Sequence, residues 1–63
     1  MYAITVNIVM REGNWNRCGS LPTFYLDENV QGITDERHAE MIARTIVDPL
    51  GRYDECYIQA VKV

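Results

Sequence analysis

Histidine and cysteine are the residues of this 63-residue chain whose types could support catalysis or metal binding. His38-Ala39-Glu40 has the spacing of the metal-ligating histidine and the proton-shuttling glutamate of zinc-dependent deaminases, but no Pro-Cys-x-x-Cys follows it. Cys18 and Cys56 are single thiols, and nothing in the sequence places either beside His38 as a nucleophile and its base would require. We therefore expect no catalytic residues, no metal site and no cofactor. The alternatives are a Cys18–Cys56 disulfide and a metal site formed by Cys18, His38, Cys56 and a carboxylate.

Carboxylates occur as adjacent pairs at Asp27-Glu28, Asp35-Glu36 and Asp54-Glu55. Adjacent side chains point apart on a helix or a strand, so these pairs predict solvated side chains and helix caps rather than an acid and base pair. The sequence also has no phosphate-binding glycine loop, dinucleotide-binding glycine pattern or nucleophile elbow. These observations favour a protein that is not an enzyme.

A binding function is better supported, by the segment REGNWNR at residues 11–17. Its tryptophan is the only one in the chain and is flanked by two arginines, and both residue types are enriched at binding hot spots. We predict a binding site formed by Trp15, Arg11, Arg17, Asn14 and Asn16. The alternative is that Trp15 folds back and covers the open end of a small core.

The same tryptophan and arginines suggest a second hypothesis, a weak binder of single-stranded nucleic acid that stacks an unpaired base on Trp15. The formal net charge of −3 argues against duplex nucleic acid as a partner, because such binding depends on neutralising phosphates. The sequence contains no apolar run long enough to span a membrane. Met1 leads directly into an alternating segment without a basic region, so we expect no secretory signal and a cytoplasmic location.

The elements that position these residues follow from hydrophobic periodicity. Side chains alternate from Tyr2 to Met10, which predicts a half-buried strand. Glycine, asparagine, serine and proline dominate the next segment, which predicts a long loop, and a short aromatic run after Pro22 predicts an edge strand. The predicted order is strand 2–10, loop 11–22, strand 23–27, helix 35–48 and strand 55–63, in a single domain 1–63.

The predicted helix has identifiable boundaries. Thr34 is the expected N-cap, and Pro49 forces a stop at Asp48. Its apolar stripe is expected to consist of Ala39, Ile42, Ala43 and Ile46.

These elements predict an α+β domain, with a three-stranded antiparallel sheet in the order 2-1-3 that one helix covers on one face. The order places the alternating strand 2–10 in the centre and the strand led by Pro22 at an edge. In the alternative topology the last strand lies beside strand 23–27 in a parallel crossover.

One helix covers only one face of a sheet, so the other face is predicted to be open. Its expected residues are Thr5, Asn7, Val9, Tyr25, Tyr57, Gln59, Val61 and Val63. This face is too apolar for full solvation, and a domain this small has little core, so we expect a homo-oligomer or an unidentified protein partner. The predicted interface comprises Tyr25, Tyr57, Val61, Val63 and Val9. In one alternative the last strand faces the other way and exposes Cys56, Ile58 and Ala60. In the other, the open face is simply an apolar surface that no partner covers.

The segment TFYLDENVQGI at residues 23–33, followed by His38-Ala39 at a helix start and by the Asp48-Pro49 stop, resembles small uncharacterised proteins of actinobacterial bacteriophages. This resemblance implies an accessory phage protein of the bacterial cytoplasm and supplies no functional residues. The layout of elements is also similar to the partial ribonuclease-H-like domain of HicB antitoxins, which are dimeric binders of a small toxin. The loop lacks the Pro-Asp-Leu-Pro-Gly run of that family, so the similarity is limited to the fold.

Overall fold

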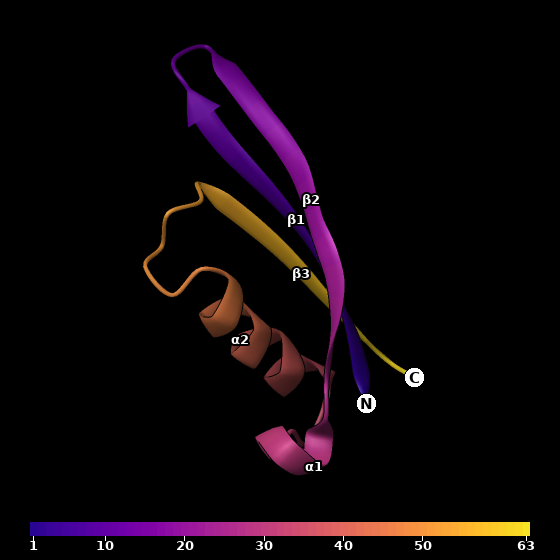
Figure 1. Cartoon of the computed structure of the whole chain (residues 1–63). Coiled ribbons are helices and arrows are strands. Elements are labelled where there is room, and N and C mark those ends of the chain that lie inside the picture. The colour runs from indigo at the N-terminus through magenta and orange to yellow at the C-terminus, as the bar shows by residue number, and fades with distance from the viewer.

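A computed structural model describes all residues from 1 to 63 (Figure 1). It contains three strands and two helices, where the sequence predicted three strands and one helix. In chain order the elements are β1 (Tyr2–Glu12), β2 (Trp15–Leu26), α1 (Glu28–Gln31), α2 (Glu36–Val47) and β3 (Glu55–Lys62).

The three strands form one antiparallel sheet in the order β2-β1-β3, which confirms the predicted α+β class and strand order. At one end of the sheet Tyr2 pairs with Leu26 on β2 and with Lys62 on β3. Because β1 pairs on both sides, it is the central strand, and its alternation of buried and exposed residues is regular from Tyr2 to Asn7.

The predicted loop at 11–22 is wrong, since all but two of these residues belong to strands. β1 continues to Glu12, which pairs with Trp15, so only Gly13 and Asn14 connect the strands. Gly13 has a φ of 61° and Asn14 has a negative φ, as in the two-residue hairpin turn with glycine in its first position. Asn16, Gly19 and Ser20 favour turns, yet on an exposed edge strand the pairing with β1 overrides this preference.

Pro22 lies inside β2, where the register shifts. Ile4 pairs with Phe24 and Val6 pairs with Leu21, so two residues of β2 stand opposite Thr5. Such a bulge accommodates a proline because the extra residue needs no ladder hydrogen bond.

The core lies where α2 packs against β3 and, less extensively, against β1. Ala39 and Ala43 are fully buried, and their small side chains allow α2 to approach the sheet closely. The predicted apolar stripe of the helix is wrong at Ile46, which is 53% exposed, while Val47 packs against the core. Because α2 packs mainly on an edge strand, not every apolar side chain of the helix has sheet beneath it. The eight buried residues are Tyr2, Ile4, Val6, Leu26, Ile33, Ala39, Ala43 and Ala60.

The ends of α2 are set by two aspartates. Asp35 is the N-cap, since its Oδ1 accepts a hydrogen bond of 2.8 Å from the His38 N–H, and Asp48 is the C-cap. The prediction of Thr34 as the cap is wrong, because Thr34 instead donates its backbone N–H to Nδ1 of His38.

The additional helix α1 is a single turn. Asp27 caps it by accepting a hydrogen bond of 2.9 Å from the Asn29 N–H, and Gly32 ends it with a φ of 66°. An aspartate followed five residues later by a glycine is a cap pattern for one helical turn, and this signal was present in the sequence.

The identity of the cap gives a test of this geometry. We expect Asp35→Ala to lower the free energy of unfolding by about 1 kcal/mol, because the His38 N–H loses its acceptor. Thr34→Ala is the matched control. It should change the free energy of unfolding by only a few tenths of a kcal/mol, since surface substitutions away from such contacts have small effects. Urea unfolding of both variants measures the difference, and a larger loss for Thr34→Ala would contradict the assignment.

Candidate functional site

The β1–β2 hairpin projects beyond the rest of the molecule (Figure 1). The pairing of β1 with β3 ends at Val9 and Glu55, whereas its pairing with β2 continues to Glu12 and Trp15. All residues from 11 to 20 are exposed. The molecule is consequently elongated, with extents of 43 × 21 × 15 Å. Its radius of gyration of 12.6 Å compares with roughly 10.6 Å for a compact domain of this length.

Trp15 lies at the end of this hairpin with 78% of its surface exposed. The alternative that Trp15 covers the open end of the core is therefore wrong. Trp15 is in register with Glu12, and Met10 is in register with Arg17, so all four side chains project from the face of the sheet that also carries the core residues.

The two arginines predicted to flank Trp15 lie on opposite faces of the hairpin. Arg17 shares the face of Trp15, and its Nη1 lies 3.3 Å from Glu12 Oε1. Arg11 lies on the open face, where its Nη2 lies 3.3 Å from Glu55 Oε1. Each arginine is thus paired with a carboxylate. Of the remaining predicted residues, Asn14 is in the turn and Asn16 is in register with Arg11 on the open face. The structure does not bring the five predicted binding residues onto one surface.

Asp54 ends the sheet at the base of the hairpin, a role that the sequence did not indicate. Its Oδ2 accepts a hydrogen bond of 2.5 Å from the backbone N–H of Arg11. A carboxylate therefore satisfies a donor of β1 just beyond the last residue of β1 that pairs with β3. Beyond this point, that side of β1 has no further strand neighbour.

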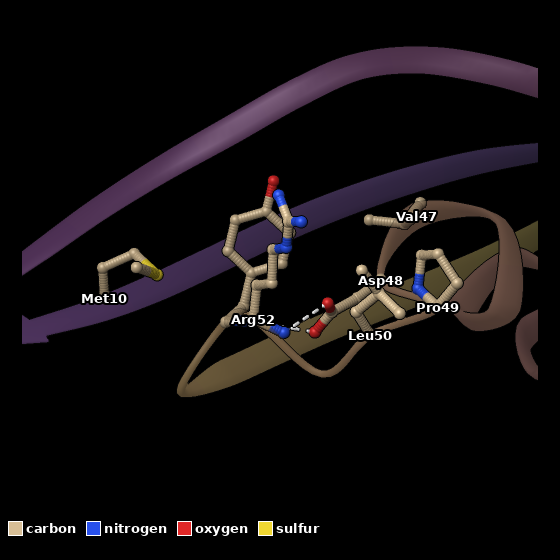
Figure 2. A pocket seen from close by; sticks show the side chains of 7 residues that line it. Met10, Val47, Asp48, Pro49, Leu50 and Arg52 are labelled. Atoms are coloured by element: carbon tan, nitrogen blue, oxygen red, sulfur yellow. Dashed lines mark hydrogen bonds between the residues drawn. The ribbon is translucent and has the colours of Figure 1, made fainter.

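A hollow of about 440 Å³ lies on the core-bearing side, where the hairpin leaves the rest of the fold (Figure 2). Met10 of β1 forms one side, and the end of α2 with the following loop forms the other. The full lining is Met10, Val47, Asp48, Pro49, Leu50, Arg52 and Tyr53. A second depression of about 330 Å³ adjoins it through Met10 and runs along the hairpin.

The loop wall of this hollow is held in place by Asp48. Its carboxylate accepts hydrogen bonds from the backbone N–H groups of Arg52, at 2.6 Å, and Tyr53, at 3.2 Å (Figure 2). Gly51 has a φ of 64°, which lets the loop turn back toward β3. The guanidinium of Arg52 forms no ion pair, and Leu50 is 71% exposed. The hollow thus combines apolar surface with two opposite charges, the Asp48 carboxylate held by backbone N–H groups and the Arg52 guanidinium without an ion pair.

The residues of the predicted interface lie on the opposite face of the sheet. Tyr25 and Val61 are both in register with Ala3, and they form one row across the three strands. Tyr57 lies further along β3, in register with Asn7. Tyr25, Tyr57, Val61 and Val63 are exposed and Val9 is half-buried. Cys56, Ile58 and Ala60 point the other way, so the alternative facing of the last strand is wrong.

The two cysteines are free and lie on opposite faces of the sheet. Cys18 is in register with Val9, and Cys56 with Ile8, with β1 between them. Two strand spacings of about 4.8 Å separate β2 from β3, which is too far for a disulfide. The structure gathers no group of three or more histidine, cysteine or acidic side chains that could hold a metal. No helix is long and apolar enough to cross a membrane.

Comparisons with protein-family models, with curated proteins and with solved structures find no match to this chain. The resemblances to phage proteins and to HicB antitoxins therefore stay predictions.

The open face offers one electrostatic test. The Glu55 carboxylate raises the pKa of the Tyr57 hydroxyl above its ordinary value of 10.0, first as its hydrogen-bond acceptor and then as a nearby negative charge. A raised pKa means that the contribution of Tyr57 to stability is present below about pH 10 and is lost as the pH rises through the folded-state pKa.

We expect Glu55→Gln to lower the pKa of Tyr57, because the negative charge is removed and Arg11 remains close. An ultraviolet absorbance titration of the phenolate measures the change, with Tyr57→Phe identifying the signal of this residue. An unchanged titration curve in Glu55→Gln would show that Glu55 does not perturb the tyrosine.

Proposed function

We propose that this chain is a small non-enzymatic protein that acts through protein–protein interaction and associates with itself. The phage-type accessory role in a bacterial cytoplasm is part of this proposal and rests on the sequence resemblance alone. The observation that carries the proposed interaction is the projecting hairpin, which holds the only tryptophan of the chain 78% exposed. No residue of its projecting end, from 11 to 20, belongs to the core.

Exposure of Trp15 is unfavourable for an isolated molecule. Aromatic side chains bury the largest apolar areas at interfaces, and tryptophan is the residue type most enriched at binding hot spots. Only eight residues of the chain are buried, so the core contributes little stability, and association would add to it. An exposed indole on a projecting two-stranded arm therefore supports a role in binding.

A protein partner fits this surface better than a nucleic acid does. Both arginines of the hairpin already face carboxylates, Glu12 and Glu55, and they lie on opposite faces. A nucleic acid would also have to approach a chain of net charge −3.

The open face of the sheet supplies a second surface. The row of Tyr25, Ala3 and Val61 is apolar and reaches the edge strands on both sides. Further along the same face, Ser20 donates a hydrogen bond of 2.7 Å to Asn7 Oδ1, so this part of the face carries satisfied polar groups. This mixture of apolar and satisfied polar groups is typical of protein interfaces that form and dissociate.

Self-association is tested by sedimentation equilibrium over a wide concentration range, with and without a reductant. We expect a reversible dimer whose dissociation constant is unaffected by the reductant, because the cysteines are free and lie on opposite faces. A monomer at every concentration would contradict self-association. A dimer present only without the reductant would show that an intermolecular disulfide, rather than these surfaces, holds the copies together.

The nucleic-acid hypothesis has its own test in the fluorescence of Trp15. Titration with a single-stranded oligonucleotide at low salt should leave the emission unchanged if the partner is a protein. Strong quenching that disappears with added salt would favour the nucleic acid instead.

A further inference from the structure

The exposed indole and the hollow lie on the same side of the sheet but do not meet within one molecule. Met10 lines the hollow, and Trp15 stands opposite Glu12, two residues further along β1. At a rise of about 3.4 Å per residue, Trp15 is about 7 Å beyond the edge of the hollow. Trp15 is not among the lining residues. Because the strands pair up to the two-residue turn, the end of the hairpin has no loop that could bring Trp15 back to the hollow.

We propose that the hairpin of a second copy of this chain occupies the hollow. The indole of Trp15 from the second copy packs against Val47, Pro49 and Leu50, and the hairpin of the first copy enters the hollow of the second. This inference rests on the self-association proposed above and identifies the surface that forms it.

The shape of the molecule supports a second copy as the occupant. The hairpin and the loop at 48–54 form an inside corner, with the projecting arm on one side and the end of α2 on the other (Figure 1). Two such corners related by a two-fold axis interlock, since each arm fills the corner of the other copy. An interface of this kind uses the same surface on both copies and closes at a dimer.

The charges at the two ends of this contact are complementary. Glu12 is in register with Trp15, so it enters the partner's hollow together with the indole, where Arg52 is the positive charge without an ion pair. The Glu12–Arg17 pair is exposed and therefore weak, which allows Glu12 to exchange partners. Asp48, the acidic residue of the lining, already accepts two backbone hydrogen bonds.

A dimer of this design requires only a small part of the molecular surface. A stable interface removes roughly 800 Å² from each partner, which is about a sixth of the 4654 Å² surface of this chain. Among the surfaces of the molecule, the corner combines a large exposed aromatic side chain with a recess. Its second depression, along Ile8, Met10 and Gly19, extends the contact area down the hairpin.

The first experiment measures the dimer dissociation constant of Trp15→Ala by sedimentation equilibrium. We expect an increase of at least about 30-fold, because a hot-spot tryptophan leaves the interface. Met41→Ala is the control, since it removes an apolar side chain of 63% exposure from α2, outside both surfaces, and it should change the constant by less than about threefold. Tyr25→Ala reports separately on the open face. Circular dichroism of the three variants checks that the fold is retained.

The second experiment exchanges charges between copies. Glu12→Arg and Arg52→Glu should each weaken the dimer, because every cross-copy pair then joins like charges. An equimolar mixture of the two variants should form dimers as tightly as the wild type, since both cross-copy pairs in the mixed dimer join opposite charges. A contact within one chain cannot be restored by mixing.

The outcomes separate this inference from the proposed function. A dimer that withstands Trp15→Ala and both charge variants, but dissociates on Tyr25→Ala, would overturn the hairpin contact and leave self-association through the open face. A wild-type chain that stays monomeric at every concentration would overturn both. Restored dimerisation in the mixture supports the reciprocal contact.

Discussion

β1 pairs along its whole length with β2 but along only part of its length with β3, and the shape of the molecule follows from this difference. Where three strands lie side by side, α2 packs on the sheet and the core forms. Where only two strands remain, no helix covers them, and the hairpin stands in solvent with Trp15 near its end. The same mismatch in strand length creates the corner beneath the hairpin and therefore the hollow.

Two aspartates hold the segment that precedes β3, where the three-stranded part of the sheet ends. Asp48 ends α2 and holds the next turn by accepting backbone hydrogen bonds, and Asp54 satisfies the Arg11 N–H beyond the start of β3. The backbone N–H groups of Arg11, Arg52 and Tyr53 thus have carboxylate acceptors, so they do not require strand pairing beyond Glu55. The polar groups that limit the sheet thus also build one wall of the candidate binding site. The open sheet face remains available for a different partner when the hairpins of two copies engage each other.

The sequence predicted the α+β class, the strand order and the open face, because these depend on periodicity. Alternation from Tyr2 onward and the stop signal at the end of α2 are local signals that the tertiary structure leaves in place. The long hairpin was missed because Asn16, Gly19 and Ser20 favour turns, while the pairing that makes them a strand depends on the distant partner β1. The hollow was missed for a related reason, since Met10 and Leu50 are brought near each other only by the topology. Trp15 stands out in the sequence by its type alone, and its separation from Arg11 follows from the strand register that the two-residue turn sets.

The central claim is that the hairpin carrying Trp15 is a contact surface between copies. Because this is the only tryptophan, its accessibility to acrylamide, measured by fluorescence quenching across a range of protein concentrations, reports on that contact directly. We expect strong quenching in dilute solution, as the 78% exposure of the monomer requires, and protection that grows with concentration as dimers form. Quenching that remains equally strong when sedimentation shows a dimer would contradict the hairpin as the contact.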